Sequence, residues 1–239
     1  MAIEAVTFDY WNTLVVDSSD IANRRIDSWL GILEDAGFAV EREALHLEFA
    51  ANWQRFVDHW NANQQYDAAM AAETILESLG HRVPDAIQES LVEAFVDAGN
   101  HTHLELTAGV ADTLATLHAA GIRIGIICDV GFTPSTILRA HLERFGVIGL
   151  FDHWSFSDEV GVYKPSPVIF DHALAGLGGV DPSVAAHVGD LRRTDVAGAL
   201  AKGMTAVRYA GQFDDDSADH PEAHHVIRHH AELPGVLAI

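Results

Sequence analysis

The feature that most constrains the fold of this chain is a regular alternation of helical patterns with short apolar segments after Gly109. The apolar segments are IRIGIIC at residues 122–128, VAAHVG at 184–189 and MTAVRYA at 204–210. Apolar runs of this length that are separated by helical patterns are typical of buried parallel strands. The alternation therefore predicts an α/β fold, with a parallel sheet that is covered by helices on both faces.

The N-terminal region adds one more strand, after which the pattern becomes entirely helical. The apolar stretch from Ile3 to Phe8 is rich in β-branched residues and predicts a buried strand. Helical periodicity follows at residues 19–37, 41–60, 67–79 and 84–98, with no convincing strand among them. We therefore expect an all-helical domain at 17–105, inserted into a core that consists of 1–16 and 106–239.

Composition excludes several classes of partner. The chain has 35 acidic and 14 basic residues and a formal net charge of −21, which opposes attraction to nucleic-acid phosphates and to anionic membranes. No apolar stretch approaches the ~20 residues of a membrane-spanning helix. Because a basic leader is absent and Cys128 is the only cysteine, we expect a cytoplasmic protein without disulfides. The sequence does not specify an oligomeric state.

Asp9 directly follows the first predicted strand. The carboxyl ends of parallel strands form the edge at which open α/β sheets bind ligands. Two later segments, GVYKPSP and VGDLRRTD, carry Lys164 and the pair Asp190 and Asp195. We expect these charged residues to meet at the same edge, where Asp9 is a candidate nucleophile.

Four segments resemble, in their order and spacing, the motifs of the haloacid dehalogenase superfamily of phosphohydrolases and dehalogenases. FDYWNTL is similar to the first motif and IICDVG occupies the place of the second. The KP of GVYKPSP is similar to the third motif, and HVGDLRRTDVAGA to the GDxxxxD form of the fourth. This resemblance spans nearly the whole chain. It implies a modified Rossmann core with an inserted helical cap of the C1 type.

The resemblance also implies covalent chemistry at Asp9, which in this superfamily attacks phosphorus or, in some members, carbon. Lys164 would orient the Asp9 carboxylate and offset its charge. Mg²⁺ is the implied cofactor, because this hard cation prefers oxygen ligands. Its ligands would be Asp9, the main-chain carbonyl of Trp11, Asp190 and, through water, Asp195. A divalent cation and an ammonium group together reduce the repulsion between a carboxylate and an anionic phosphate.

Substrate contacts are expected from the motifs at Thr13, Cys128, Asp129 and Arg192. Cys128 departs from the family pattern, in which the second motif usually supplies a Ser or Thr hydroxyl. A thiol is only a weak hydrogen-bond donor, and a lone cysteine most often behaves as a small apolar residue. The main-chain amides of Asp129 and Val130 are alternative contacts for a phosphate.

Trp11 is the second departure from the pattern. Phosphatases of the superfamily usually carry an Asp at this position, which protonates the leaving group and later activates water. Loss of such a group typically lowers the rate by ~10²- to 10⁴-fold. Dehalogenases carry an aromatic residue here, and halide leaves without protonation. However, they generally lack the leading acid of the fourth motif, which is Asp190 in this chain.

Together these observations predict a Mg²⁺-dependent phosphatase or phosphotransferase that acts on a small phosphorylated metabolite through an aspartyl-phosphate on Asp9. Two alternatives stay open. One is a hydrolase of the 2-haloacid dehalogenase type, which Trp11 favours. The other is a catalytically weakened binding protein, because the indole of Trp11 replaces the usual acid–base carboxylate.

Overall fold

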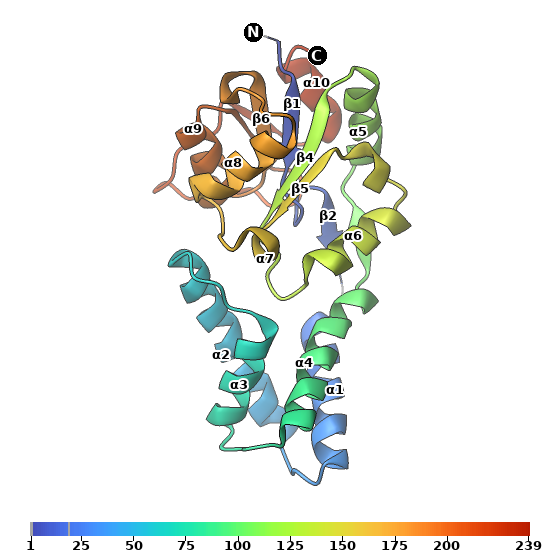
Figure 1. The fold of residues 1–239 in the computed structure, drawn as a ribbon, viewed down its shortest axis with the longest axis vertical. Helices are drawn as coiled ribbons and strands as arrows, with labels where there is room; N and C mark the ends of the chain where they lie inside the picture. The colour runs from blue at the N-terminus through green and yellow to red at the C-terminus, as the bar shows by residue number, and fades with distance from the viewer. Residues whose placement is uncertain (1, 19) are drawn as a thin grey trace. The chain divides into compact units, whose positions relative to one another are not determined.

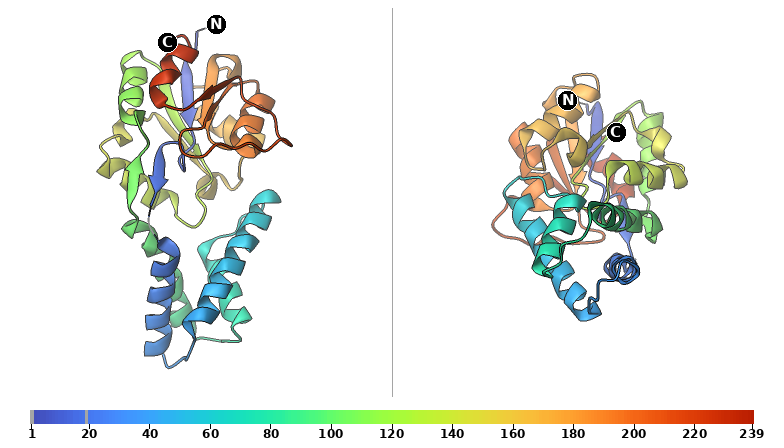
Figure 2. Two further views of the ribbon diagram at one scale, coloured as in Figure 1. Left: turned by 180° about the vertical axis from the view of Figure 1, so that it is seen from behind. Right: turned by 60° about the horizontal axis from the view of Figure 1, so that its bottom comes forward.

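The computed structural model describes residues 2–18 and 20–239, which form two compact units (Figures 1 and 2). The first, here called the sheet unit, consists of the chain up to Asp17 together with Leu104–Val130 and Leu138–Ile239. The second, the helical unit, consists of Ser18–His103 and Gly131–Ile137. The short segment Gly131–Ile137, which follows the end of a core strand, thus packs with the inserted helices, and the sequence pattern did not predict this.

The sheet unit is built on a six-stranded sheet in which each pair of neighbouring strands is parallel. The strand order is β5-β4-β1-β6-β7-β8. The strands are β1 (Ala5–Phe8), β4 (Arg123–Cys128), β5 (His153–Phe156), β6 (Ala185–Gly189), β7 (Thr205–Tyr209) and β8 (His225–Ile227). The predicted α/β fold is confirmed.

Helices cover both faces of this sheet (Figure 1). They are α5 (Val110–Ala119), α6 (Ser135–Arg144), α7 (Ser157–Val160), α8 (Pro167–Gly176), α9 (Ala197–Lys202) and α10 (Leu233–Val236). Short helical turns lie at Ile148–Leu150 (η2), Pro182–Val184 (η3), Arg192–Val196 (η4) and His230–Glu232 (η5). The turn η4 has π-helical geometry.

The apolar residues of β1 are divided between two clusters, because successive strand residues point to opposite faces. Val6 and Phe8 belong to a cluster that includes residues of α5, α6 and α10. Ala5 belongs to the other cluster, which includes residues of α8 and α9. All four residues of β1 are buried, as expected for the central strand of a parallel sheet. This buried strand ends directly before Asp9 and so places it at the carboxyl edge of the sheet.

A small antiparallel pair of strands marks where the chain leaves the sheet unit and returns to it. Strand β2 (Val15–Asp17) pairs with β3 (Leu104–Leu106), in the register Val15 to Leu106. Thr107 then hydrogen-bonds back to the loop after β1, since its hydroxyl donates to the carbonyl oxygen of Thr13 at 2.6 Å. The loop that follows Asp9 is therefore fixed from two sides.

The helical unit contains α1 (Ile21–Asp35), α2 (Arg42–Asn61), α3 (Ala68–Ser78), α4 (Asp85–Asp97) and the turn η1 (Ala98–His101). Its core is aromatic: Trp29 is fully buried against Phe49 and Phe95, and Phe132 packs on Phe95 with ring centroids 5.1 Å apart. The Trp29 indole donates a hydrogen bond to the carbonyl of Leu91 at 2.9 Å, which satisfies its buried N–H. Among the described residues, none of the helices combines the length and the apolar character that crossing a bilayer requires.

Candidate active site

Three carboxylates and one ammonium group lie together in the sheet unit and are here called the carboxylate cluster. Asp9 follows β1 and Asp190 follows the neighbouring strand β6, while Asp195 lies in the turn η4. Lys164 comes from the loop before α8. All four side chains are buried, and oxygen atoms of the three carboxylates lie within 4.8 Å of one another. The structure therefore brings together the four charged residues that the motifs indicated.

The Lys164 ammonium is held by three acceptors. Its Nζ donates to Asp9 Oδ1 at 2.5 Å, to Asp195 Oδ1 at 2.6 Å and to the carbonyl oxygen of Ile127 at 3.1 Å. An ammonium group has three hydrogens, so each has a partner. Burial alone would lower the pKa of Lys164, but the charges of Asp195 and Asp9 outweigh it and raise the pKa well above its usual value. Lys164 is therefore a fixed positive charge.

Ionisation of all three carboxylates would place more negative charge in the cluster than Lys164 balances. Burial raises the pKa of Asp9 well above its usual value, and the charges of Asp195 and Asp190 add to this effect against the opposing effect of Lys164. Burial and the charge of Asp195 raise the pKa of Asp190 to about 7. A divalent cation among these oxygens would favour their ionised forms. The cluster thus has the oxygen donors, and the surplus of acids over basic groups, that suit a hard cation such as Mg²⁺.

The loop after β1 contributes three further groups near Asp9 in the sequence. Asn12 adopts a left-handed backbone conformation with φ of 57°, which asparagine tolerates better than most residues. Its side-chain nitrogen donates to Asp190 Oδ2 at 3.2 Å. Thr13 is fully buried, and its hydroxyl has no hydrogen-bond partner among the described residues. The indole of Trp11 packs edge-to-face on Tyr10 with ring centroids 4.9 Å apart. A buried hydroxyl without a partner is costly, which favours a ligand contact for Thr13.

The end of β4 contributes Cys128 and Asp129. Cys128 is fully buried, and burial together with the nearby charge of Asp9 raises its pKa well above the usual value. Its side chain is therefore a neutral thiol. The Asp129 carboxylate accepts a hydrogen bond from the main-chain nitrogen of Lys164 at 3.0 Å, which fixes the loop that carries the lysine. The main-chain nitrogen of Val130 donates to the Ser157 hydroxyl at 3.1 Å, so this amide already has a protein partner.

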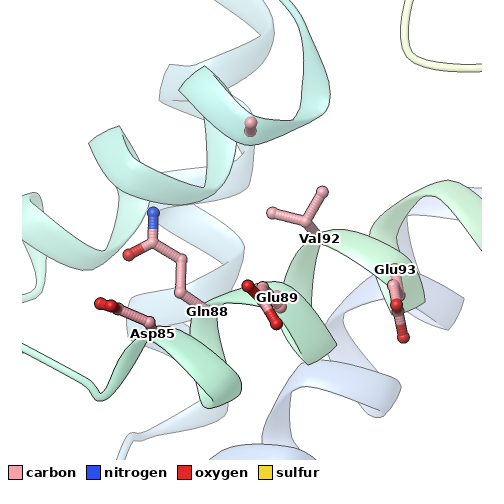
Figure 3. A pocket seen from close by; sticks show the side chains of 6 residues that line it. Asp85, Gln88, Glu89, Val92 and Glu93 are labelled. Carbon is pink, nitrogen blue, oxygen red and sulfur yellow. The ribbon is translucent and has the colours of Figure 1, made fainter.

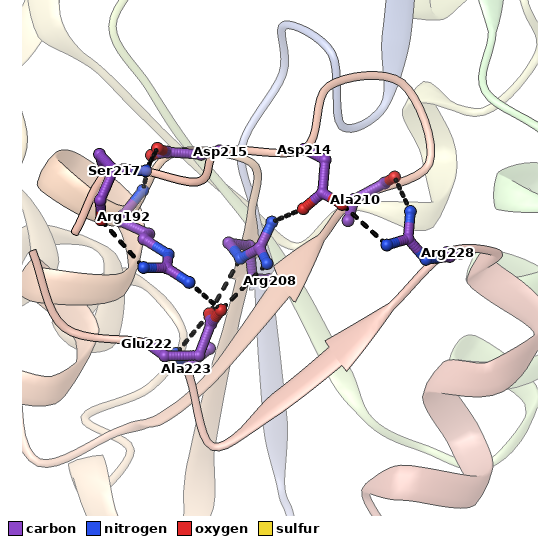
Figure 4. Close-up of polar contacts among 9 residues, drawn as sticks. All are labelled: Arg192, Arg208, Ala210, Asp214, Asp215, Ser217, Glu222, Ala223 and Arg228. Atoms are coloured by element: carbon purple, nitrogen blue, oxygen red, sulfur yellow. Dashed lines mark hydrogen bonds and ion pairs between the residues drawn. The ribbon is translucent and has the colours of Figure 1, made fainter.

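Arg192 lies in a different group of charges, here called the arginine network (Figure 4). Its members are Arg192, Arg208, Arg228, Asp214, Asp215 and Glu222. The Arg192 guanidinium forms an ion pair with Glu222 and donates to the carbonyl oxygen of Ser217 at 2.9 Å. Its main-chain nitrogen donates to Asp215 at 2.7 Å. Arg192 therefore binds the segment between β7 and β8 and not the carboxylate cluster.

Arg208 is the centre of the arginine network. It is 5% exposed and donates to both oxygens of Glu222, at 2.9 and 3.0 Å, and to Asp214 at 2.7 Å. The hydrogen bonds from Arg208 lower the pKa of Glu222 to about 2. Hydrogen bonds also lower the pKa values of Asp214 and Asp215. The three acids of this network are therefore ionised at neutral pH, and each has a cationic or amide partner.

A separate groove of about 490 Å³ lies in the helical unit (Figure 3). It is lined by Ala69 of α3 and by Asp85, Gln88, Glu89, Val92 and Glu93 of α4. Three carboxylates on its wall would repel an anionic substrate. None of the motif residues lines this groove, so we do not assign substrate binding to it.

Sequence reasoning missed two polar residues beside the cluster. Asn12 binds Asp190, as described above, and His187 donates or accepts a hydrogen bond with Asp195 at 3.1 Å. The available signal for His187 was a single histidine within the otherwise apolar strand VAAHVG. Periodicity marks such a strand but does not indicate which side chain its polar residue meets.

Comparison with known proteins agrees with the motifs. The family model described as haloacid dehalogenase-like hydrolase matches residues 3–203. The chain is 28% identical over 214 residues to a glyceraldehyde 3-phosphate phosphatase of Methanopyrus kandleri. The match covers 89% of this chain and 87% of that protein. It is 33% identical over 116 residues to a ribulose-1,5-bisphosphate 5-phosphatase of Halopiger xanaduensis, about half of each protein (48% and 47%).

A solved structure with the same overall fold is that of a 2-haloacid dehalogenase from Pseudomonas syringae pv. Tomato DC3000. The two chains superpose with a TM-score of 0.72 and are 26% identical, and the match covers 99% of this chain and 98% of the other. Similarity thus extends both to phosphatases and to a dehalogenase.

Proposed function

Because this chain belongs to the haloacid dehalogenase-like hydrolase family, we propose that it is a Mg²⁺-dependent phosphatase of small phosphorylated metabolites. The observation that carries the proposal is the contact of the Asp9 carboxylate with Lys164 inside a cluster of three buried acids. A dehalogenase that works without a metal needs only one carboxylate, as the nucleophile that attacks carbon. Two further carboxylates close to that nucleophile would repel its negative charge. Three carboxylates with one lysine favour a site that is completed by a divalent cation.

In this proposal, Asp9 is the nucleophile. Its Oδ1 is held by Lys164, whereas Oδ2 accepts no hydrogen bond from the described residues. Oδ2 forms a bond to phosphorus while the bond from phosphorus to the leaving oxygen breaks. Water then attacks the phosphorus of the aspartyl-phosphate, which releases inorganic phosphate and regenerates Asp9.

The residues proposed to hold Mg²⁺ are Asp9, Asp190 and the main-chain carbonyl of Trp11. Asp195 would act from the outer coordination sphere, because each of its oxygens already accepts two hydrogen bonds from the protein. When bound, the ion supplies positive charge that stabilises the transferring phosphoryl group. Lys164 supplies fixed positive charge at Oδ1 of Asp9.

Substrate binding is proposed at Thr13, whose buried hydroxyl lacks a partner among the described residues, and at the end of β4, next to Cys128 and Asp129. We do not propose Arg192, because Glu222 and Ser217 engage its guanidinium. Residues 17–105 would serve as the cap domain that selects the substrate.

Trp11 limits the leaving groups that this site can expel. The indole cannot protonate a departing alkoxide, so the leaving oxygen has to take its proton from water or from the substrate itself. Acyl and aryl phosphates, whose leaving oxygens are weakly basic, should therefore react faster than simple alkyl phosphates. Glyceraldehyde 3-phosphate and ribulose 1,5-bisphosphate, the substrates named for two relatives, belong in the same panel.

The test is release of inorganic phosphate from this panel with Mg²⁺ and with chelator. Asp9→Asn should lower kcat by on the order of 10⁴-fold or more, because it removes the nucleophile. Asp171→Asn, which alters an acid paired with Lys202 on α9, is the matched control and should retain activity. Unchanged phosphate release by Asp9→Asn would contradict the covalent mechanism.

A second candidate, 2-haloacid hydrolysis, is favoured by Trp11 and by the similarity to a dehalogenase. It predicts halide release from a 2-haloacid that persists in the presence of chelator. If neither phosphate nor halide is released while Mg²⁺ still binds, a binding protein is the better description.

A further inference from the structure

We propose that His187 is a positioning residue which, together with Thr7, fixes the Asp195 carboxylate and through it the Lys164 ammonium beside Asp9. Its effect on turnover rests on the proposed function, whereas its effect on the geometry of the cluster does not. His187 is the one histidine of β6, and the mechanism above assigns it no role.

A continuous chain of hydrogen bonds connects the centre of the sheet with the carboxylate cluster. Thr7 of β1 and His187 of β6 are directly paired in the parallel register. The Thr7 hydroxyl lies 2.9 Å from His187 Nδ1, and His187 Nε2 lies 3.1 Å from Asp195 Oδ1. Asp195 Oδ1 then accepts from Lys164 at 2.6 Å. Thr7 and His187 are 0% and 1% exposed, so water does not compete for these bonds.

The direction of each hydrogen bond follows from the chemistry of its partners. Asp195 Oδ1 accepts from the Lys164 ammonium at 2.6 Å, and a carboxylate can only accept. His187 Nε2 must therefore carry the proton. In a neutral imidazole that carries its proton on Nε2, Nδ1 is an acceptor. The Thr7 hydroxyl has one hydrogen and two acceptors in reach, Nδ1 of His187 at 2.9 Å and the carbonyl oxygen of Ala186 at 3.3 Å. We assign the hydrogen to the nearer acceptor, Nδ1, and this contact selects the Nε2–H tautomer.

Asp195 is surrounded by donors on all sides. Oδ1 binds Lys164 and His187, whereas Oδ2 accepts from the main-chain nitrogen of Leu191 at 3.0 Å and from the Thr194 hydroxyl at 3.4 Å. Leu191 and Thr194 belong to the same loop as Asp195. His187 is thus the one side chain on a sheet strand that anchors this carboxylate.

The end of β6 is shaped to admit this arrangement. A Cβ atom at Gly189 would lie 2.2 Å from Asp195 Cγ, so only glycine leaves room for the carboxylate against the strand. His187 also packs edge-to-face on Phe170, with ring centroids 5.3 Å apart. An apolar side chain at position 187 would pack equally well against the Phe170 ring, and it would avoid the free-energy cost of burying a polar group. The hydrogen bond to Asp195 is the feature that explains a histidine here.

Three variants separate positioning from packing. In His187→Gln, the side-chain amide can still donate to Asp195, whereas His187→Leu keeps the volume but removes the donor. We expect His187→Leu to lower kcat and the affinity for Mn²⁺ by about 10- to 100-fold each, the usual effect of residues that support metal ligands. KM should change little. His187→Gln should stay within a few-fold of the wild type. His172→Leu, on the surface of α8, is the control for loss of a histidine.

Two readouts do not depend on turnover. Mn²⁺ affinity is measured by electron paramagnetic resonance, and the tautomer of His187 by ¹⁵N chemical shifts of the wild type and of Thr7→Val. The wild type should show a protonated Nε2 and an unprotonated Nδ1, and Thr7→Val should lose this preference, whereas Thr7→Ser should keep it. If no substrate turns over, the proposed function fails, but these measurements still decide the role of His187.

Other outcomes would overturn the inference. Equal losses in His187→Gln and His187→Leu, at unchanged melting temperature, would show that the donor is not what matters. Wild-type Mn²⁺ affinity in His187→Leu would do the same. If His187→Leu does not fold, His187→Gln and the two Thr7 variants carry the test, and an Nδ1–H tautomer in the wild type would contradict the assignment directly.

Discussion

Two groups of charged residues in the sheet unit are built in opposite ways. The carboxylate cluster buries three acids around one lysine, Lys164. The arginine network matches three arginines with three acids, and most of its acids lie nearer the surface. The pKa of Asp190 rises to about 7 in the first group, whereas that of Glu222 falls to about 2 in the second.

A difference of this kind is expected between a functional site and a structural one. Ion pairs with equal numbers of acids and bases stabilise a fold modestly and need no ligand. The arginine network, which holds the segment between β7 and β8, is of this kind. Buried carboxylates without enough positive charge destabilise a fold, and perturbed pKa values of this kind are concentrated at functional sites. The surplus of buried acids over basic groups in the carboxylate cluster therefore supports the proposal that a cation completes it.

The largest predicted effect is the difference in unfolding free energy between variants that replace Lys164 and Lys202, the two lysines of the chain. Lys164→Met leaves three buried acids without a cation, and loss of one partner from a buried ion pair typically costs ~3–5 kcal/mol of unfolding free energy. Lys202→Met removes only the partner of the surface residue Asp171 and should cost about 0–1 kcal/mol. Urea unfolding of both variants, with chelator at pH 8, measures this contrast. Equal losses would mean that Lys164 is not compensating buried charge.

The two groups should also give the metal-free protein opposite responses to pH. Because the folded-state pKa of Asp190 is raised from 3.8 to about 7, the folded protein binds more protons than the unfolded chain between these values. The contribution of Asp190 to stability therefore falls as pH rises through this range, by at most ~4 kcal/mol, and the raised pKa of Asp9 acts in the same direction. Glu222 has a lowered pKa of about 2 instead of 4.5, so its contribution is present above pH 4.5 and is lost toward pH 2.

Asp190→Asn is the variant that tests this pH dependence. It should make the metal-free protein more stable than the wild type at pH 8 and similar to it at pH 4, as measured by urea unfolding with chelator. Glu222→Gln should lower stability at both pH values. A metal-free wild type whose stability is flat from pH 5 to pH 8 would argue against the raised pKa of Asp190.

Mg²⁺ should remove the instability of the carboxylate cluster. An ion that binds the folded state alone stabilises it by ~2.7 kcal/mol at one hundred times its dissociation constant, so the melting temperature should rise on addition of Mg²⁺ at pH 8. Chelator should reverse the rise, and Asp190→Asn should abolish most of it. A rise of equal size in Asp190→Asn would locate the bound ion elsewhere.

Much of this contrast could be anticipated from the sequence, because strands and their ends are local features. The apolar runs around β1, β4 and β6 predicted the sheet, and the order of the motifs predicted that Asp9 and Asp190 would share one edge. The same reasoning assigned Arg192 to the substrate, since its position inside the fourth motif is local information. Its partner Glu222 lies 30 residues away, and only the folded chain shows that pair.

The sequence pattern did not predict the hydrogen bond between His187 and Asp195, for a similar reason. It depends on the π-helical turn η4, which turns Asp195 back toward β6, and on the absence of a side chain at Gly189. The grouping of Gly131–Ile137 with the helical unit likewise depends on the contact of Phe132 with Phe95. Such contacts arise between segments that no periodicity relates.

The smallest effect is expected at the edge of the arginine network. Arg228 pairs with Asp214 and is 68% exposed in its side chain, and exposed ion pairs of this kind often contribute nothing measurable. Arg228→Ala should therefore leave the melting temperature and kcat nearly unchanged, with any loss removed by high salt. Arg208→Ala breaks the buried centre of the same network and should lower the melting temperature clearly, in both low and high salt. If Arg228→Ala is as damaging as Arg208→Ala, the network is a cooperative unit, and its stability cannot be assigned to burial of Arg208 alone.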